Sequence, residues 1–284
     1  MRNMTRATAV RTALSNARYE LLPTAKVEAA VVEHVPTDIR LTVTASPGKG
    51  LDSTLDCAER LLAKGYRVTP HLAARMVRDR AHLADLVDRL VALGVDDVFV
   101  PAGDADPPAG IYPGSLDLLR DLSELGRPFP AVGITGYPES HPTISDDVTV
   151  QAMWDKREHA TYIVSNLCFD AAMIRRWVER LRSRGVGMPV LIGMPGPVER
   201  AKLLTMATKI GVGESTRFLA KNATVFARIA APGGYRPARL LEQTAPLFAD
   251  EAMAVNGVHL FTFNQIAETE QWRNKLLDET LSAR

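Results

Sequence analysis

The chain has 284 residues, of which 46% are hydrophobic and 24% charged, and its formal net charge is +1. This composition is typical of a globular protein with ample apolar surface for a large core, and a near-neutral chain without a Lys/Arg run argues against nucleic-acid binding. No apolar run approaches the ~20 residues of a membrane span, and the basic lead-in, residues 1–16, lacks the apolar core of a signal peptide.

Strand-like and helix-like segments alternate along the rest of the chain. The predicted strands span residues 17–23, 39–44, 66–72, 97–101, 130–136, 162–168, 189–193 and 258–263. The predicted helices are 25–35, one capped by Asp52 or Ser53 and ended by Gly65, one ended by Gly94, 115–125, 146–159, one capped by Asp170, 199–210, 215–229, 238–254 and 265–281.

This alternation predicts an α/β protein, a single (β/α)8 TIM barrel over residues 1–284. Each helix is long enough for a right-handed crossover between parallel strands, and the extra helix after the seventh strand is the main elaboration. A doubly wound open sheet is the structural alternative. It is less well supported, because no GxGxxG follows an early strand and SPGKG at 46–50 lacks phosphate-loop spacing.

The most informative stretch is VFVPAGDADPP at 98–108, where an apolar strand opens into a Pro-rich loop at Asp104. Such strand ends carry the chemistry of parallel barrels, although Gly-Asp is also ordinary turn chemistry. The same rule selects Glu20, Thr44, His71, Asp104, Tyr137, Asn166, Met194 and Asn264. Carboxylates, amides and a histidine around an apolar axis suit a small polar ring, and a buried carboxyl with a raised pKa can act as an acid.

Structural roles remain open for several of these residues: Glu20 pairing with a cation, or Asn264 capping the last helix. A metal site is disfavoured, because His71, His141 and His259 lie on different segments without HExxH or HxH spacing. A Ser/His/Asp triad has no GxSxG to start from. Two cysteines without CxxC spacing favour a reducing compartment, so we expect a cytoplasmic protein.

Short segments at these same places resemble motifs of the methylenetetrahydrofolate reductase family, and the resemblance spans nearly the whole chain. The segments YELLP (19–23), VTAS (43–46), TPHL (69–72), AGDADPP (102–108), GYPESHP (136–142), IVSNLCFD (163–170) and FTFN (261–264) resemble FEFFPP, VTYG, xPHL, RGDxPP, YPExHP, ITQxFFD and FYTLN, respectively. Each motif alone is weak, and GYPESHP is the nearest match. Their order and spacing together are fairly specific.

The resemblance implies a barrel that reduces 5,10-methylenetetrahydrofolate to 5-methyltetrahydrofolate with NADH or NADPH, normally through bound FAD. Glu20 lies at the position of the family's proton donor, and Asp104 and Asn166 lie where the family holds the pterin. The implied substrate contacts also include Tyr137 and Asn264, and the implied cofactor positions are Thr44, His71, Ala102, His141 and Lys156.

The departures from the family pattern fall on the flavin side. Ala102 replaces the family's arginine before Gly-Asp, and Lys156 is the one candidate left for the family's lysine. Either flavin is bound weakly or not at all and NADH passes hydride directly to the folate, or residues such as Arg75 replace the lost phosphate contacts. A non-catalytic folate-binding barrel is a third hypothesis. The choice between NADH and NADPH, and the oligomeric state, stay open.

Overall fold

A computed structural model of the protein describes residues 2–139, 145–197 and 235–282. Eight parallel strands form one sheet in the order β3-β2-β1-β8-β7-β6-β5-β4. The strands are β1 (Arg18–Leu21), β2 (Arg40–Val43), β3 (Val68–Pro70), β4 (Asp97–Phe99), β5 (Ala131–Gly136), β6 (Tyr162–Ser165), β7 (Val190–Pro195) and β8 (Val255–Phe261). A parallel bridge between His71 and Phe99 joins the two edge strands, so the sheet closes into the predicted (β/α)8 barrel.

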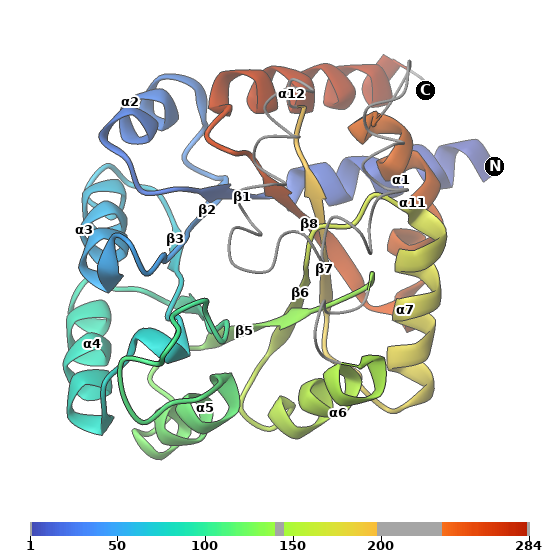
Figure 1. The fold of residues 1–284 in the computed structure, drawn as a ribbon. Coiled ribbons are helices and arrows are strands. Elements are labelled where there is room, and N and C mark those ends of the chain that lie inside the picture. The colour runs from blue at the N-terminus through green and yellow to red at the C-terminus, as the bar shows by residue number, and fades with distance from the viewer. Residues whose placement is uncertain (1, 140–144, 198–234, 283–284) are drawn as a thin grey trace.

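Helices surround the sheet as a ring (Figure 1). They are α1 (Arg2–Ser15), α2 (Ala25–His34), α3 (Gly50–Leu62), α4 (Arg80–Ala92), α5 (Ser115–Glu124), α6 (Asp146–Lys156), α7 (Ala171–Ser183), α11 (Pro237–Ala249) and α12 (Ile266–Ser282), with short 3-10 turns η1 (Ala74–Met76) and η2 (Glu251–Met253). The helices predicted at 199–210 and 215–229, which include the extra helix after the seventh strand, lie outside the described residues. No helix within the described ranges combines the length and apolarity needed to cross a bilayer.

Local sequence signals explain the beginnings of several helices, α7 among them. Asp170 caps α7 as predicted, because its carboxylate accepts hydrogen bonds from the backbone N–H groups of Ala172 at 2.7 Å and Met173 at 3.2 Å. The prediction that Asp52 or Ser53 caps α3 was wrong. That helix begins earlier, at Gly50, whose φ of +74° forms a left-handed turn into the helix.

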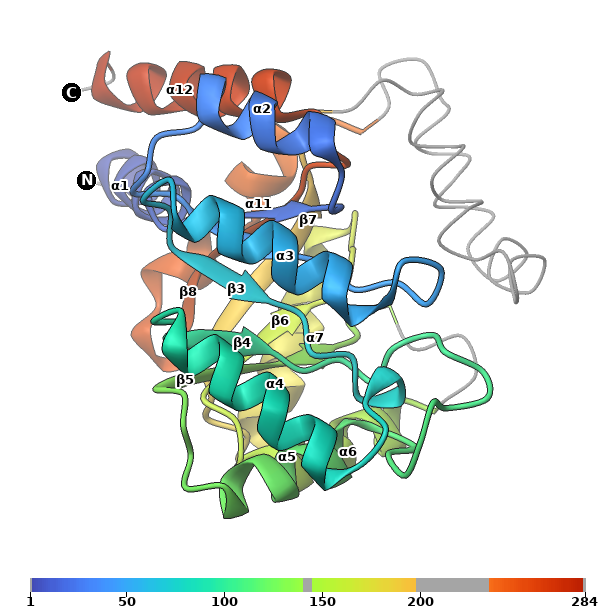
Figure 2. The ribbon, with the colours of Figure 1, turned by 90° about the vertical axis from the view of Figure 1, so that its left-hand side faces the viewer.

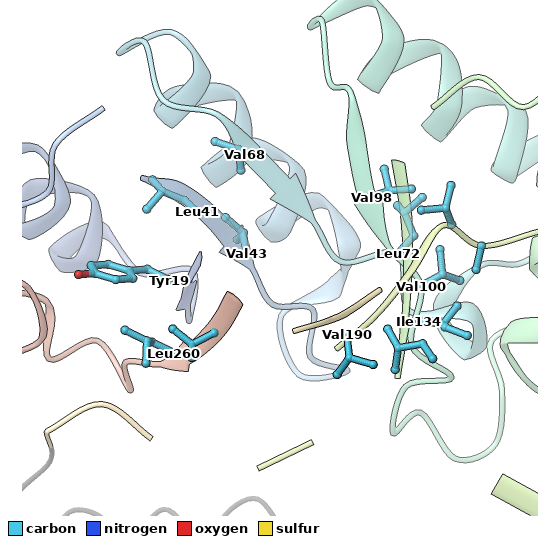
Figure 3. Close-up of a cluster of buried hydrophobic side chains, with 14 of the residues drawn as sticks. Tyr19, Leu41, Val43, Val68, Leu72, Val98, Val100, Ile134, Val190 and Leu260 are labelled. Atoms are coloured by element: carbon cyan, nitrogen blue, oxygen red, sulfur yellow. The ribbon is translucent and has the colours of Figure 1, made fainter. Parts of the chain in front are cut away.

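Strand alternation divides the apolar residues into two groups. The larger core lies between the strands and the helices, and Figure 3 shows Tyr19, Leu41 and Val98 among its members. A smaller cluster comes from the opposite faces of β4 to β7 and fills the barrel interior; its buried residues are Phe99, Tyr162, Val164 and Leu191. This smaller cluster fills the side of the interior formed by β4 to β7, and polar side chains such as Glu20 and His259 occupy the side formed by β1, β2, β3 and β8.

The N-terminal lead-in is a helix, α1, and it packs against α11, α12 and β8. Its apolar side buries Ala9, Val10, Ala13 and Leu14, each at most 7% exposed. Figure 2 shows α1 at the end of the barrel opposite the loop between β2 and α3. The helix therefore covers the outside of β8 and leaves the carboxyl ends of the strands free.

Candidate active site

Neighbouring strands β1 and β8 bring Glu20 and His259 together inside the barrel. Tyr19 of β1 and Leu260 of β8 belong to the core between the strands and the helices, so the residues next to them on each strand face the interior. In the parallel register Arg18 pairs with His259, and Glu20 pairs with Phe261. This offset places the glutamate diagonally above the histidine, toward the carboxyl end of the strands.

Glu20 Oε2 lies 3.0 Å from His259 Nε2 and 4.0 Å from His71 Nε2. The two imidazoles are almost fully buried, with side chains 1% and 8% exposed, whereas the glutamate side chain is 18% exposed. The Glu20 carboxyl group is thus partly exposed at the mouth of the barrel and contacts two buried histidines. This arrangement can store and deliver a proton.

Burial decides the charge of His71. Desolvation lowers the pKa of His71 to about 4, although the neighbouring Glu20 carboxylate opposes the shift. His71 is therefore neutral near pH 7. Among the described residues, its Nε2 and the hydroxyl of Thr44 are buried without a hydrogen-bond partner. Such atoms at the ends of neighbouring strands point to a ligand or water that completes the site.

Asp104 lies on the far side of the mouth, in the loop after β4. The preceding Gly103 has a φ of +86°, and a Cβ there would come within 2.9 Å of Ala73, so the turn requires glycine. Asp104 is exposed and interacts electrostatically with Tyr137 at the end of β5: burial raises the pKa of Tyr137, and the Asp104 carboxylate adds to that rise. The two residues form a second polar group at the mouth.

The two predicted amide ligands, Asn264 and Asn166, both form hydrogen bonds with the backbone. Asn264 Oδ1 accepts from the Leu22 N–H and its Nδ2 donates to the Leu22 carbonyl, both at 2.9 Å, which ties the end of β8 to the end of β1. Asn166 is exposed, and its Oδ1 accepts from the Leu167 N–H at 2.8 Å. Asn264 therefore joins the ends of the two strands, and Asn166 is accessible at the mouth.

Two further predicted positions, Met194 and Lys156, do not join this group. Met194 was selected by the strand-end rule, but it faces the helices and is fully buried, because the inward positions of β7 are Leu191 and Gly193. Lys156 ends α6, at the end of the barrel where β6 begins, and burial lowers its pKa. His141 lies outside the described residues.

Sequence reasoning missed His259 as a member of the site, although it was considered as a metal ligand. The signal was present, since Gly257, His259 and Phe261 alternate with apolar Val258 and Leu260. No group of three or more His, Cys, Asp and Glu that could hold a metal occurs among the residues that the structure describes.

A second polar layer lies below the site, at the amino ends of the strands, and was also missed. Asp97 is 1% exposed and accepts hydrogen bonds from Arg18 Nη1 at 2.6 Å and from the Tyr162 hydroxyl at 2.8 Å. Arg40 Nη1 lies 3.6 Å from the same carboxylate. This layer faces away from the mouth, where barrel residues serve stability more than catalysis.

Fold and site together define a parallel-barrel protein with an acid–base cluster at the carboxyl ends of its strands, the arrangement of a barrel enzyme. The family model for methylenetetrahydrofolate reductase matches residues 24–273. The chain therefore belongs to the methylenetetrahydrofolate reductase family, as the motifs predicted.

Individual relatives are distant. Methylenetetrahydrofolate reductase 2 of Saccharomyces cerevisiae (strain ATCC 204508 / S288c) is 28% identical over 102 residues, 33% of this chain, and the match spans only 17% of the yeast protein's length. Among solved structures, a putative lyase/mutase from Burkholderia cenocepacia J2315 superimposes with a TM-score of 0.50 at 16% identity, covering 99% of this chain and 87% of that one. The second match supports the fold alone.

The described residues fit only part of a flavin dinucleotide. Thr44 and His71 offer unpartnered polar atoms, but Ala102 stands where the family has an arginine for the diphosphate. Arg75 does not replace it freely, since its guanidinium is bonded to the carbonyls of Ala105 at 2.6 Å and Pro113 at 3.3 Å and to the Asp106 carboxylate. Among the described residues, neither Ala102 nor Arg75 therefore offers a free cation for the diphosphate of FAD.

Proposed function

We propose that this protein reduces 5,10-methylenetetrahydrofolate to 5-methyltetrahydrofolate, with NADH or NADPH as the source of hydride. The observation that carries the proposal is the position of the Glu20 carboxyl group, which contacts two buried histidines and is itself partly exposed at the mouth of the barrel. The family match begins at residue 24, so the role of Glu20 rests on this geometry and on the YELLP motif rather than on the matched range.

The first step is proton transfer. The Glu20 carboxyl gives its proton to the folate nitrogen that leaves the methylene bridge, and the other nitrogen forms a cationic iminium with the methylene carbon. Neutral His71 beside Glu20 adds no positive charge that would repel this cation. The negative charge that remains on the carboxylate stabilises the cation.

The second step is reduction of the iminium carbon. Asp104 and Asn166, both exposed at the mouth, pair with ring N–H and carbonyl groups of the pterin and hold its face toward the nicotinamide. NADH then transfers hydride directly to the methylene carbon and leaves as NAD⁺. One proton and one hydride are consumed for each methyl group formed. The lack of a free cation for the FAD diphosphate among Ala102, Arg75 and Lys156 favours this flavin-independent route.

The decisive experiment measures anaerobic NADH oxidation on addition of 5,10-methylenetetrahydrofolate, with and without added FAD, after the visible spectrum of the purified protein is recorded. We expect a colourless protein that turns over without flavin. A yellow protein whose activity follows its flavin content would refute direct transfer but not the reductase function. No turnover under either condition would refute the reductase function and favour the folate-binding barrel.

The residue test is Glu20→Gln. A general acid contributes about 10²–10⁴-fold, so kcat should fall at least 100-fold while folate affinity stays within a few-fold. The matched control is Glu33→Gln on α2, whose side chain is 73% exposed and outside the site. Unchanged turnover in Glu20→Gln would show that another group donates the proton.

A further inference from the structure

We propose that His259 is the positioning residue for Glu20: its Nε2–H holds the carboxyl by one oxygen so that the other oxygen carries the proton to be donated. This inference rests on the proposed function and assigns a role to a residue that neither the motifs nor the strand-end rule selected. Its support is the geometry of the pair.

The His259 ring is buried, contacts one aromatic ring and has one hydrogen-bond partner among the described residues. It is 1% exposed, and its ring meets Phe261 edge-on with centroids 5.1 Å apart. Its Nε2 has Glu20 Oε2 as partner at 3.0 Å, and its Nδ1 has no hydrogen-bond partner among the described residues. A neutral imidazole places its proton on the nitrogen with an acceptor, so the Nε2–H tautomer fits this environment.

The two carboxyl oxygens of Glu20 are therefore not equivalent. Oε2 accepts from His259, whereas Oε1 has no hydrogen-bond partner within the described part of the chain. When Oε1 gives its proton to the substrate nitrogen, the negative charge left on the carboxylate is stabilised by the same Nε2–H bond. His259 thus keeps its own proton throughout and supplies orientation and charge stabilisation.

The surrounding charges keep His259 in this role. Arg18 pairs with it in register from β1, but its guanidinium is bonded to Asp97 and Tyr162 in the layer below. His71, the residue after β3, is the other titratable side chain near the pair in the described part of the chain, and burial keeps it neutral. β7 presents Gly193 in register with His259, so it contributes no charge. Glu20 is then the acceptor available to His259 among the described residues.

Two variants test the role through the pH profile of kcat. His259→Phe keeps a ring but removes the donor, so we expect kcat to fall about 10–100-fold with a folate KM within about threefold of the parent. The limb on which activity falls with rising pH should move upward by about one pH unit, because the Glu20 carboxylate loses its hydrogen bond. His259→Gln restores a donor near Nε2, and its kcat and pH limb should return most of the way.

An unchanged pH limb in His259→Phe, or equal loss in His259→Phe and His259→Gln, would overturn the positioning role. Histidine ¹⁵N NMR gives a readout independent of turnover, with the His259→Gln spectrum assigning the His259 signals. We expect the Nε2–H tautomer in the parent and its perturbation in Glu20→Gln; the Nδ1–H tautomer in the parent would refute the inference. Failure of the reductase assay with the expected NMR result would refute the proposed function alone.

Discussion

Asp97 offers the sharpest test of how this barrel is held together below the site. Asp97→Ala removes a carboxylate that is 1% exposed and leaves Arg18 and Arg40, whose side chains are only 19% and 10% exposed, without that counter-charge. Removing one partner of a buried ion pair costs about 3–5 kcal/mol. Because Arg18 is partly solvated and Arg40 keeps Asp96, the lower value of about 3 kcal/mol applies, with a melting temperature about 6–12 °C lower.

The matched control is the neighbouring Asp96→Ala. Asp96 also pairs with Arg40, at 2.8 Å, but its side chain is 49% exposed. Exposed pairs contribute about 1 kcal/mol or less, so this variant should lose far less stability than Asp97→Ala. Urea unfolding followed by circular dichroism measures both free energies. Equal losses in the two variants would refute the reasoning, because burial would then not set the cost of the missing charge.

Three further predictions concern the site and the barrel interior. Burial lowers the pKa of His71 to about 4, so as the pH falls the imidazole takes up a proton in the unfolded chain before it does so in the folded protein. The free energy of unfolding should therefore decrease as the pH falls from about 6.5 to about 4. His71→Gln should flatten this part of the plot of unfolding free energy against pH, measured with urea, and an unchanged slope in the variant would contradict the assignment. Gly193→Ala places a Cβ 1.9 Å from the Ser165 carbonyl oxygen and should destabilise the protein by about 1–3 kcal/mol. The control is Gly187→Ala, whose Cβ would have nothing within 4 Å and which should change the stability by less than about 0.5 kcal/mol. Similar melting temperatures for the two variants would contradict the argument that Gly193 is needed for close packing. Asn264→Gly can keep the left-handed φ of +59° but loses both hydrogen bonds to the Leu22 backbone. The variant should lose about 1–2 kcal/mol of unfolding free energy, measured by thermal unfolding. An unchanged stability would mean that water replaces those bonds.

The strands and helices could be predicted because each carries its own periodicity and end signals. The eight predicted strands overlap the observed ones, and Gly65, Gly94 and the capping Asp170 lie where helices end or begin. The closure of the barrel followed from the alternation of these segments. Glu20 and Asp104 were placed at the mouth by the same rule, since a parallel barrel gathers its strand ends.

Contacts between distant residues were harder to predict. The hydrogen bond between His259 and Glu20 joins positions 239 residues apart, and the alternation that turns His259 inward does not by itself identify its partner. Met194 was misplaced because inward and outward positions on β7 depend on a register that only the neighbouring strands fix. The early start of α3 depended on the left-handed backbone of Gly50, which leaves no periodic signal.

The helix α1 ties the beginning of this chain to its end, and that has a consequence for its synthesis. The partners of α1 are α11, α12 and β8, and Asn16 donates a hydrogen bond to a carbonyl 240 residues later, at Asn256. At about 5–20 residues per second, translation takes roughly 10–50 s to deliver those partners. For that time Val10 and Leu14 lack the surface that later buries them, so α1 gains its apolar packing only after β8, α11 and α12 have been synthesised.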